Sequence, residues 1–373
     1  MSLATRNEAL LLQELGHDVQ LVTGAGSARA PSATEGSPLV AARFEISGNG
    51  SIWTPVRGET KRLRAFVLAG GWDLVIVQGW QNWATDTILD AVIESGSDVP
   101  VFLRSHGLST DSQFGPVVFR IARFLGWRLY RWRRVPRSLA RIQCLVALAG
   151  LEDDDRFLDI RMARARGSNV RVIPNISPSF RSEVLAHQMQ PGRATGREWF
   201  LSVGGFSSAK NELGVLEAYL AAEVDDVPIV FVGPKTNDYS ASLDQRAKEA
   251  RLRNVRIVVD PSPAELADLY RGALAVVSAS LTECQSLAIL DGLAFGVPFL
   301  ATDSGDLRDH RGGQVVDDIA SLGCAMRELT TSGELLATLR ARAEADYRER
   351  FAIERVRARW IDLLATVGRA IEE

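Results

Sequence analysis

The chain has 373 residues, more than one core usually holds, and 46% of them are hydrophobic, so two packed domains are expected. A formal net charge of −3 and a pI near 6.0 argue against a nucleic-acid-binding protein. Cys144, Cys284 and Cys324 are widely spaced and form no CxxC pair, which predicts reduced thiols in a cytoplasmic protein. No signal peptide and no bilayer-spanning apolar run is evident.

Helix and strand patterns alternate along the chain. Helices are predicted over 7–15, 84–93, 263–270 and, with a break near Phe351, 334–371. Short apolar runs predict strands over 19–23, 74–77, 101–104, 145–148, 170–173, 200–203, 228–232, 255–259, 273–277 and 299–302. Strands that alternate with helices indicate parallel sheets covered on both faces.

The segment 281–309 reads LTECQSLAILDGLAFGVPFLATDSGDLRD and carries the strongest functional signal. Glu283 and Asp291 are separated by seven residues, and a Gly-Val-Pro turn follows them. A helix that begins near Ser286 leaves its first backbone N–H groups unpaired, so Gln285, Ser286 and Leu287 are candidates for binding an anion such as a diphosphate. The alternative is a buried helix preceded by a solvated acid.

This segment resembles the donor-site signature of retaining nucleotide-sugar glycosyltransferases with the GT-B fold, the group usually called family 4. The resemblance implies that Glu283 lies beside the transferred sugar and that Asp291 contacts the ribose, although the family's second acid is normally glutamate. It also implies that the anomeric configuration is retained. The resemblance further implies that no metal is needed. No cofactor is expected, because the nucleotide sugar is itself a substrate of these enzymes.

The same resemblance sets the expected domains, two doubly wound Rossmann-like domains facing a cleft. The sequence Ile173-Pro174-Asn175 is similar to the family's junction after the first domain. We expect an acceptor-side domain over 1–178, a linker over 179–197 and a donor domain over 198–345. The last helix, 346–373, is expected to pack on the first domain.

The loop 202–211 resembles the family's phosphate loop. Lys210 occupies the position of a lysine that neutralises the diphosphate, and Gly204 begins the loop. Gly205 stands where the family usually has an arginine, so Lys210 is expected to carry more of the charge. The alternative is a surface lysine beside a glycine turn.

His106 ends a predicted strand of the first domain, where ligands of open α/β sheets bind. By resemblance it lies near the transferred sugar; alternatively it only caps or packs. His187 and His310 show no partner pattern, so no metal site is predicted. The run 153–155, three aspartates, is interpreted as a solvated helix start.

The start of the chain departs from the family. Leu15-Gly16-His17-Asp18-Val19 matches the end of the family's first helix, but residues 1–6 contain no strand and no glycine. Either the native chain is longer or the first domain, apparently lacking its usual first strand, is rearranged, since deleting a central strand would leave buried backbone groups unpaired.

The region 117–151 is rich in arginine, from Arg120 to Arg141, and Phe119, Trp127 and Trp132 are interleaved. Arginines with interfacial aromatics favour anionic lipid head groups, which would suit a lipid-linked acceptor and a peripheral position at the inner face of the membrane. The alternative is an ordinary amphipathic helix whose arginines pair with acids elsewhere. Nothing else in the sequence supports nucleic-acid binding.

The sequence therefore predicts a metal-independent retaining glycosyltransferase that moves a sugar from a nucleotide sugar to an acceptor hydroxyl, on a lipid-linked sugar or a glycan. Two alternatives stay open. One is a nucleotide-sugar epimerase on the same fold, which would need no acceptor. The other is a degenerate, non-catalytic nucleotide-binding partner, which Gly205, Asp291 and the absent first strand favour.

Overall fold

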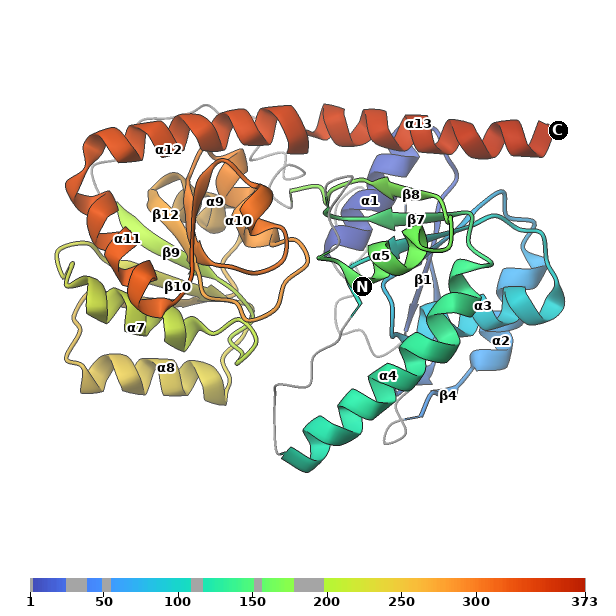
Figure 1. Ribbon diagram of the computed structural model, residues 1–373, viewed down its shortest axis with the longest axis horizontal. Helices are drawn as coiled ribbons and strands as arrows, with labels where there is room; N and C mark the ends of the chain where they lie inside the picture. Colours follow the sequence, from blue (N-terminus) through green and yellow to red (C-terminus); the bar gives the residue numbers. More distant parts are fainter. Residues whose placement is uncertain are drawn as a thin grey trace. The chain divides into compact units, whose positions relative to one another are not determined.

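A computed structural model describes residues 3–24, 39–48, 55–108, 117–150, 156–177 and 198–372 (Figure 1). The chain forms two compact units. Unit 1 contains Met1–Pro174 and Arg357–Glu373, and unit 2 contains Asn175–Val356. The predicted linker 179–197, the three aspartates at 153–155 and His187 lie outside the described residues.

Unit 2 is built on one parallel sheet of six strands. The strands are β9 (Trp199–Val203), β10 (Ile229–Gly233), β11 (Val255–Val259), β12 (Ala273–Ser278), β13 (Phe299–Thr302) and β14 (Gly313–Val316). Their spatial order is β11-β10-β9-β12-β13-β14, so the direction of winding reverses between β9 and β12. At such a reversal the loops after two neighbouring strands separate and leave room for a ligand.

Helices cover both faces of this sheet because its strands are apolar on both sides. One face packs against α7 (Glu212–Ala222), α8 (Asp238–Glu249) and α11 (Ile319–Thr331). The other packs against α9 (Pro263–Arg271), α10 (Leu287–Ala294) and the π-helical turn η3 (Tyr347–Phe351), which follows α12 (Gly333–Asp346). Side-chain caps fix the helix starts; Ser262, for example, forms a reciprocal capping box with Glu265 at the start of α9.

Unit 1 contains a four-stranded parallel sheet of β5 (Val75–Gln78), β6 (Val101–Ser105), β7 (Cys144–Ala147) and β8 (Val170–Val172), in that order. Two further pairs are separate sheets: β1 (Gln20–Gly24) with β2 (Val40–Phe44), and β3 (Ile46–Ser47) with β4 (Arg57–Gly58). The helices are α1 (Leu3–Glu14), α2 (Thr60–Ala69), α3 (Trp83–Ser95), α4 (Val117–Leu139), α5 (Leu158–Arg164) and α13 (Ile353–Glu372). One apolar core joins residues of β2, β5, β6 and β7 with α2, α3 and α4.

The predicted α/β architecture of two Rossmann-like units is confirmed, and the predicted strands are present with ends shifted by at most one residue. The predicted break near Phe351 is also present, because η3 ends there and α13 begins at Ile353. No helix among the described residues is both long and apolar enough to cross a bilayer. All three cysteines are free.

Candidate donor site of unit 2 and the His106 site of unit 1

The loops after β9 and β12 bring Lys210 and Glu283 together at the reversal point of the unit 2 sheet. The Lys210 ammonium forms a salt bridge with the Glu283 carboxylate, and their side chains are 36% and 11% exposed. The two loops are also joined through backbone, because the Leu281 N–H donates to the Ala209 carbonyl at 2.9 Å. A cation and a carboxylate 73 residues apart in sequence thus share one edge of the sheet.

Glu212 fixes the backbone of the loop after β9, and this role was not predicted from the sequence. Its buried carboxylate accepts hydrogen bonds from the N–H groups of Phe206 at 3.0 Å and Ser207 at 3.2 Å. Gly204 leaves room for that carboxylate, since a Cβ there would lie 2.4 Å from Oε1 of Glu212. Asn211 caps α7 and donates to the Ala279 carbonyl at 3.2 Å, which ties this loop to the end of β12.

Gly205, the next residue of this loop, has a different environment. It is exposed, its backbone is not in the left-handed region, and a Cβ would have no atom within 4 Å. The position therefore accepts a Cβ without displacing a neighbour.

The start of α10 presents backbone N–H groups beside this pair. Ser286 is the N-cap, and its hydroxyl accepts from the Ile289 N–H at 3.5 Å. The N–H groups of Leu287 and Ala288 open the helix and have no partner within it, as in every α-helix. Together with the helix dipole they favour a bound anion.

Gln285 is buried and connects three segments of unit 2. Its Oε1 accepts from the Asn175 N–H at 2.7 Å, and its Nε2 donates to Oδ2 of Asp306 at 3.0 Å. Gly305 allows this close packing, because its φ is +59° and a Cβ there would lie 2.6 Å from the Cys284 carbonyl. Gln285 thus fixes the loop that carries Glu283; its predicted contact with the donor stays a prediction.

Asp291 lies in the middle of α10, and its carboxylate is buried. The Ser177 hydroxyl donates to Oδ1 of Asp291. Burial, followed by the charge of Asp291, raises the pKa of Tyr270 well above its usual value. In this arrangement the carboxylate anchors the segment around Ser177, and its predicted contact with a ribose stays a prediction.

The sequence shows no partner pattern for His310, but the structure gives it two buried acidic partners. Its Nε2 lies 3.1 Å from Oδ2 of Asp306, and its Nδ1 lies 3.5 Å from Oδ2 of Asp346. Burial alone would lower the pKa of His310, but the hydrogen bonds and charges of the two aspartates outweigh it and raise the pKa to about 9. Asp346 is 36 positions away in sequence, so no local pattern could reveal it. Asp306, four residues before His310, was a signal that could have been used.

His106 lies in unit 1, just after β6, and its ring nitrogen Nε2 is 3.1 Å from Oε1 of Gln78. The Gln78 amide is oriented by Glu8, because its Nε2 donates to Oε1 of Glu8 at 2.7 Å. The oxygen of that amide must then face His106, so Nε2 of the ring carries the proton and Nδ1 is the acceptor. Burial, and next the charge of Arg104, lower the pKa of His106 to about 4, so the ring is neutral at pH 7.

Arg104 holds this cluster from the interior of unit 1. Its Nε lies 2.8 Å from Oε2 of Glu8, and its terminal nitrogens donate to the carbonyls of Ile173 and, at 3.1 Å, Pro174. The guanidinium also lies over the Trp360 ring at 5.7 Å. Sequence reasoning found only His106 of this cluster, because its partners come from α1, β5 and α13.

The structure thus brings together the sequence-predicted residues of unit 2, namely Gly204, Gly205, Lys210, Glu283, Gln285, Ser286, Leu287 and Asp291, on two neighbouring loops and one helix. His106 belongs to unit 1 and has its own surroundings. Among the residues described, no group of three or more His, Cys, Asp or Glu side chains is arranged to hold a metal ion.

Comparison with known families gives two matches that follow each other along the chain. Residues 1–175 match the model described as "Glycosyl transferase 4-like domain". Residues 186–311 match the model described as "Glycosyl transferases group 1". Together the two matches span most of both units.

Solved structures with the same fold include sucrose-phosphate synthase from Thermosynechococcus elongatus, with a TM-score of 0.70 and 18% identity over 98% of this chain and 93% of that chain. The UDP-forming α,α-trehalose-phosphate synthase from Burkholderia vietnamiensis has a TM-score of 0.62 and 16% identity over 84% and 78%. The pneumococcal O-GlcNAc transferase GtfA, solved with UDP and GlcNAc, has a TM-score of 0.60 and 13% identity over 84% and 61%. These likenesses establish the fold.

Proposed function

The chain belongs to the group 1 glycosyltransferases of the GT-B fold, and from that premise we propose that it transfers a sugar from a nucleotide-sugar donor to an acceptor hydroxyl with retention of configuration. The observation that carries this proposal is the Lys210–Glu283 pair at the reversal point of the unit 2 sheet. The pair supplies a cation for a diphosphate and a carboxylate for a sugar, beside the N–H groups that open α10.

In the proposed reaction, the bond between the anomeric carbon and the diphosphate oxygen breaks while the acceptor oxygen bonds to the same face of that carbon. Negative charge grows on the departing diphosphate, and Lys210 with the N–H groups of Leu287 and Ala288 stabilises it. The acceptor's proton leaves with the diphosphate or passes to water. We propose that this needs no metal ion, because the charge is met by Lys210 and the helix.

Glu283 is proposed to accept hydrogen bonds from sugar hydroxyls and to stabilise the positive charge that develops at the anomeric carbon. His106 is proposed to orient a sugar hydroxyl through Nδ1, since its Nε2 proton faces Gln78. The acceptor is proposed to be a glycan or a lipid-linked sugar. The nucleotide named for GtfA, UDP, is the first donor base to test.

The test is a calorimetric titration of the whole chain with UDP, GDP and ADP, with and without EDTA. We expect one nucleotide to bind saturably, independently of EDTA, and Lys210→Ala to weaken that binding by about tenfold or more, since a charge-assisted contact is lost. Lys235→Ala is the matched control, because Lys235 is an exposed lysine of the same unit. Equal affinity of the wild type and Lys210→Ala would reject the donor site.

One alternative function, nucleotide binding without catalysis, has specific observations in its favour. The Asp291 carboxylate is bonded to Ser177, and Gly205 supplies no cation, which suits a nucleotide-binding protein without turnover. Nucleotide binding without release of nucleoside diphosphate from any nucleotide sugar, across a panel of acceptors, would favour this alternative. An epimerase would instead convert the donor without an acceptor.

A further inference from the structure

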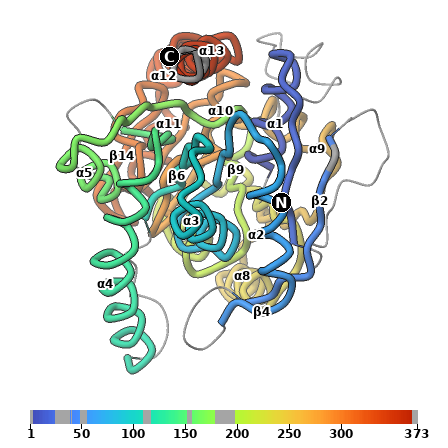
Figure 2. Tube along the Cα trace, turned by 90° about the vertical axis from the view of Figure 1, so that its right-hand side faces the viewer, coloured from blue at the N-terminus to red at the C-terminus, as the bar shows by residue number. Residues whose placement is uncertain are grey.

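Helix α4 has two halves with opposite surroundings. From Val117 to Tyr130 none of its residues is buried, whereas Val135, Ser138 and Leu139 near its end are buried in unit 1. Figures 1 and 2 both show the N-terminal half extending away from the sheet of unit 1. Among the described residues, the tertiary partners expected for an amphipathic helix are therefore present for its C-terminal part alone.

An apolar stripe runs along this uncovered half. Its members follow one another at spacings of three, four, four and three residues, which places them on one face of the helix. They are 51–76% exposed: Val118, Ile121, Leu125, Leu129 and Trp132. Val117, Phe119 and Phe124 on the same half of α4 are exposed as well, whereas the exposed large hydrophobic side chains outside this helix are scattered along the described chain. The stripe is therefore part of a contiguous apolar surface.

The helix is also strongly basic. Its 23 residues include seven arginines and no acid, and because the whole chain carries −3, the residues outside the helix carry −10. Arg128 and Arg133 lie on opposite flanks of the apolar stripe. Within the part of the chain that the structure describes, neither of them pairs with an acidic side chain. The positive charge beside the stripe is thus not neutralised by the fold.

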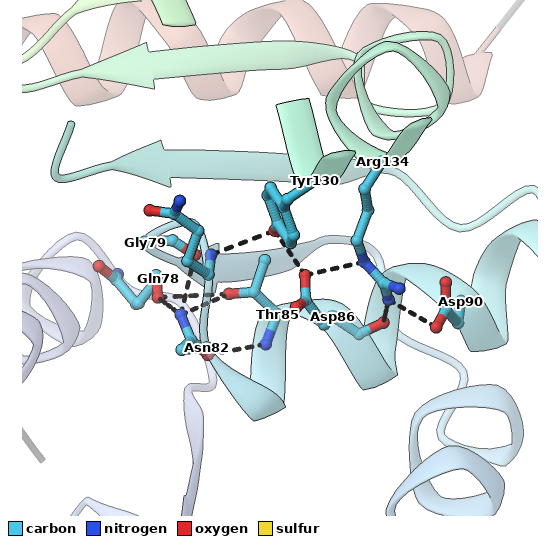
Figure 3. Close-up of polar contacts among 9 residues, drawn as sticks. Gln78, Gly79, Asn82, Thr85, Asp86, Asp90, Tyr130 and Arg134 are labelled. Carbon is cyan, nitrogen blue, oxygen red and sulfur yellow. Dashed lines mark hydrogen bonds and ion pairs between the residues drawn. The ribbon is translucent and has the colours of Figure 1, made fainter. Parts of the chain in front are cut away.

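The base of α4 is clamped to α3, as Figure 3 shows. The Tyr130 hydroxyl donates to Oδ1 of Asp86 at 2.7 Å and accepts from the Gln81 N–H at 3.1 Å. Arg134 donates to Oδ1 of Asp86 at 3.0 Å and to Oδ2 of Asp90 at 2.5 Å. The expectation that the arginines of this region pair with acids elsewhere thus holds for Arg134, which leaves the stripe and its flanking arginines as a separate surface on a fixed helix.

We propose that this surface, Val118, Ile121, Leu125, Leu129 and Trp132 with Arg128 and Arg133, docks unit 1 on an anionic lipid bilayer. The stripe would enter the boundary between head groups and acyl chains, and the flanking guanidinium groups would contact phosphate. A second copy of the chain does not suit the surface, because two such helices would oppose arginine to arginine. A neutral bilayer does not suit it either, since it leaves those charges unmatched.

The clamp gives this docking a consequence for unit 1. The Asn82 side chain, next to Gln81, donates to the carbonyls of Gln78 at 2.7 Å and Gly79 at 2.9 Å. Gln78 in turn orients His106. Hydrogen bonds and the adjoining backbone thus join the base of the docking helix to the end of β5, where Gln78 positions His106.

The proposal is tested by flotation of the full chain with vesicles of phosphatidylcholine containing about 30% phosphatidylglycerol, an anionic lipid. We expect binding to these vesicles, little binding to pure phosphatidylcholine, and loss of binding at high salt. Ile121→Ser/Leu125→Ser and Arg128→Glu/Arg133→Glu are each expected to lower the partition coefficient by at least about tenfold. Arg253→Glu/Arg256→Glu, exposed arginines of unit 2, makes the same change in net charge and is the control.

A second measurement does not depend on those variants. Brominated acyl chains should quench the fluorescence of the wild type, and Trp132→Phe should remove most of that quenching, since Trp132 lies in the stripe. Equal vesicle binding by the stripe variants and the wild type would overturn the proposal. So would binding to single-stranded DNA without binding to vesicles. Neither readout uses a nucleotide sugar, so failure here leaves the proposed transfer reaction untouched.

Discussion

The two units hold their candidate site residues in different ways. In unit 2 a single six-stranded sheet fixes the loops after β9 and β12, and Lys210 and Glu283 lie on those loops, partly open to solvent. In unit 1 the strands are divided among three sheets, and His106 is positioned by a buried polar cluster of Glu8, Gln78 and Arg104. A site on a continuous sheet should tolerate changes to its side chains, whereas a site built on buried charges should lose stability with them.

The largest effect is expected from Glu283→Ala, which tests whether the unit 2 site can lose a side chain without losing stability. If Glu283 stabilises developing charge as proposed, its removal should lower the rate of transfer by about a thousandfold. The melting temperature should change little, because within the described parts of the chain the Glu283 side chain pairs with a part-exposed lysine alone. Turnover and thermal unfolding are measured on the same sample. Unchanged turnover would remove Glu283 from the site, and a large loss of stability would break the comparison.

Glu8→Gln tests whether the buried charges around His106 in unit 1 are needed for stability. It removes the negative partner of Arg104, whose side chain is 1% exposed, and should cost about 3–5 kcal/mol of unfolding free energy. Burial raises the pKa of Glu8 in spite of the adjacent Arg104 charge, so the intact pair is not itself strongly stabilising. The cost therefore comes from removing the carboxylate that Arg104 contacts in the interior of unit 1.

Glu14→Gln is the matched control for this experiment. Glu14 lies on the same helix, α1, and pairs with Arg357 at 3.0 Å, but both side chains are more than 40% exposed. Its loss should cost less than about 1 kcal/mol in urea unfolding. A double change, Glu8→Leu/Arg104→Met, should recover part of the loss. Equal costs for Glu8→Gln and Glu14→Gln would show that burial does not decide the outcome.

The buried His310 in unit 2 leads us to expect that the unfolding free energy depends on pH. Its pKa is raised to about 9 in the folded chain, mainly by Asp306 and Asp346 acting against burial. The stability from its proton is therefore fully present below the unfolded pKa of about 6.5 and is lost as pH rises through about 9, up to about 3 kcal/mol.

Urea unfolding at pH 6 and pH 9.5 measures this loss. His310→Gln should flatten the dependence relative to His17→Gln, because His17 is exposed. A pH dependence that survives in His310→Gln would assign it to other groups. That result would show that unit 2 is less dependent on this buried cluster than the geometry indicates.

The features that could be predicted are those that depend on residues close together in sequence. Apolar runs located the main strands, and the motif around Glu283 together with the loop of Lys210 indicated the family. The elements β2, β3, β4, β14, α2, α7, α8 and α11 were not predicted. The strands among them are short, and the surfaces of α2 and α8 are largely polar.

Partners that come from distant segments could not be predicted. Glu8 and Arg104 are 96 positions apart, and His310 and Asp346 are 36 apart, so only the fold brings them together. Glu212 could have been suspected as the acid after a glycine loop, but its role depends on which backbone N–H groups turn toward it. The local sequence pattern indicates which residues are buried and where turns occur. Which buried charges pair is decided by the tertiary structure.

The smallest expected effect, Gly205→Arg, sharpens the comparison most directly. If the loop after β9 is fixed by the sheet and by Glu212, adding a side chain at an open position should leave the fold intact. By resemblance to the family, an arginine there would face the diphosphate and strengthen nucleotide binding by about 1 kcal/mol, or roughly fivefold, with a steeper dependence on salt. Gly205→Ala adds a Cβ without charge and should leave affinity unchanged, whereas Gly204→Ala should disturb the loop, because its Cβ would collide with Glu212. Weaker binding by Gly205→Arg than by Gly205→Ala would mean that the diphosphate does not lie over this loop, and the donor site would have to be sought elsewhere on unit 2.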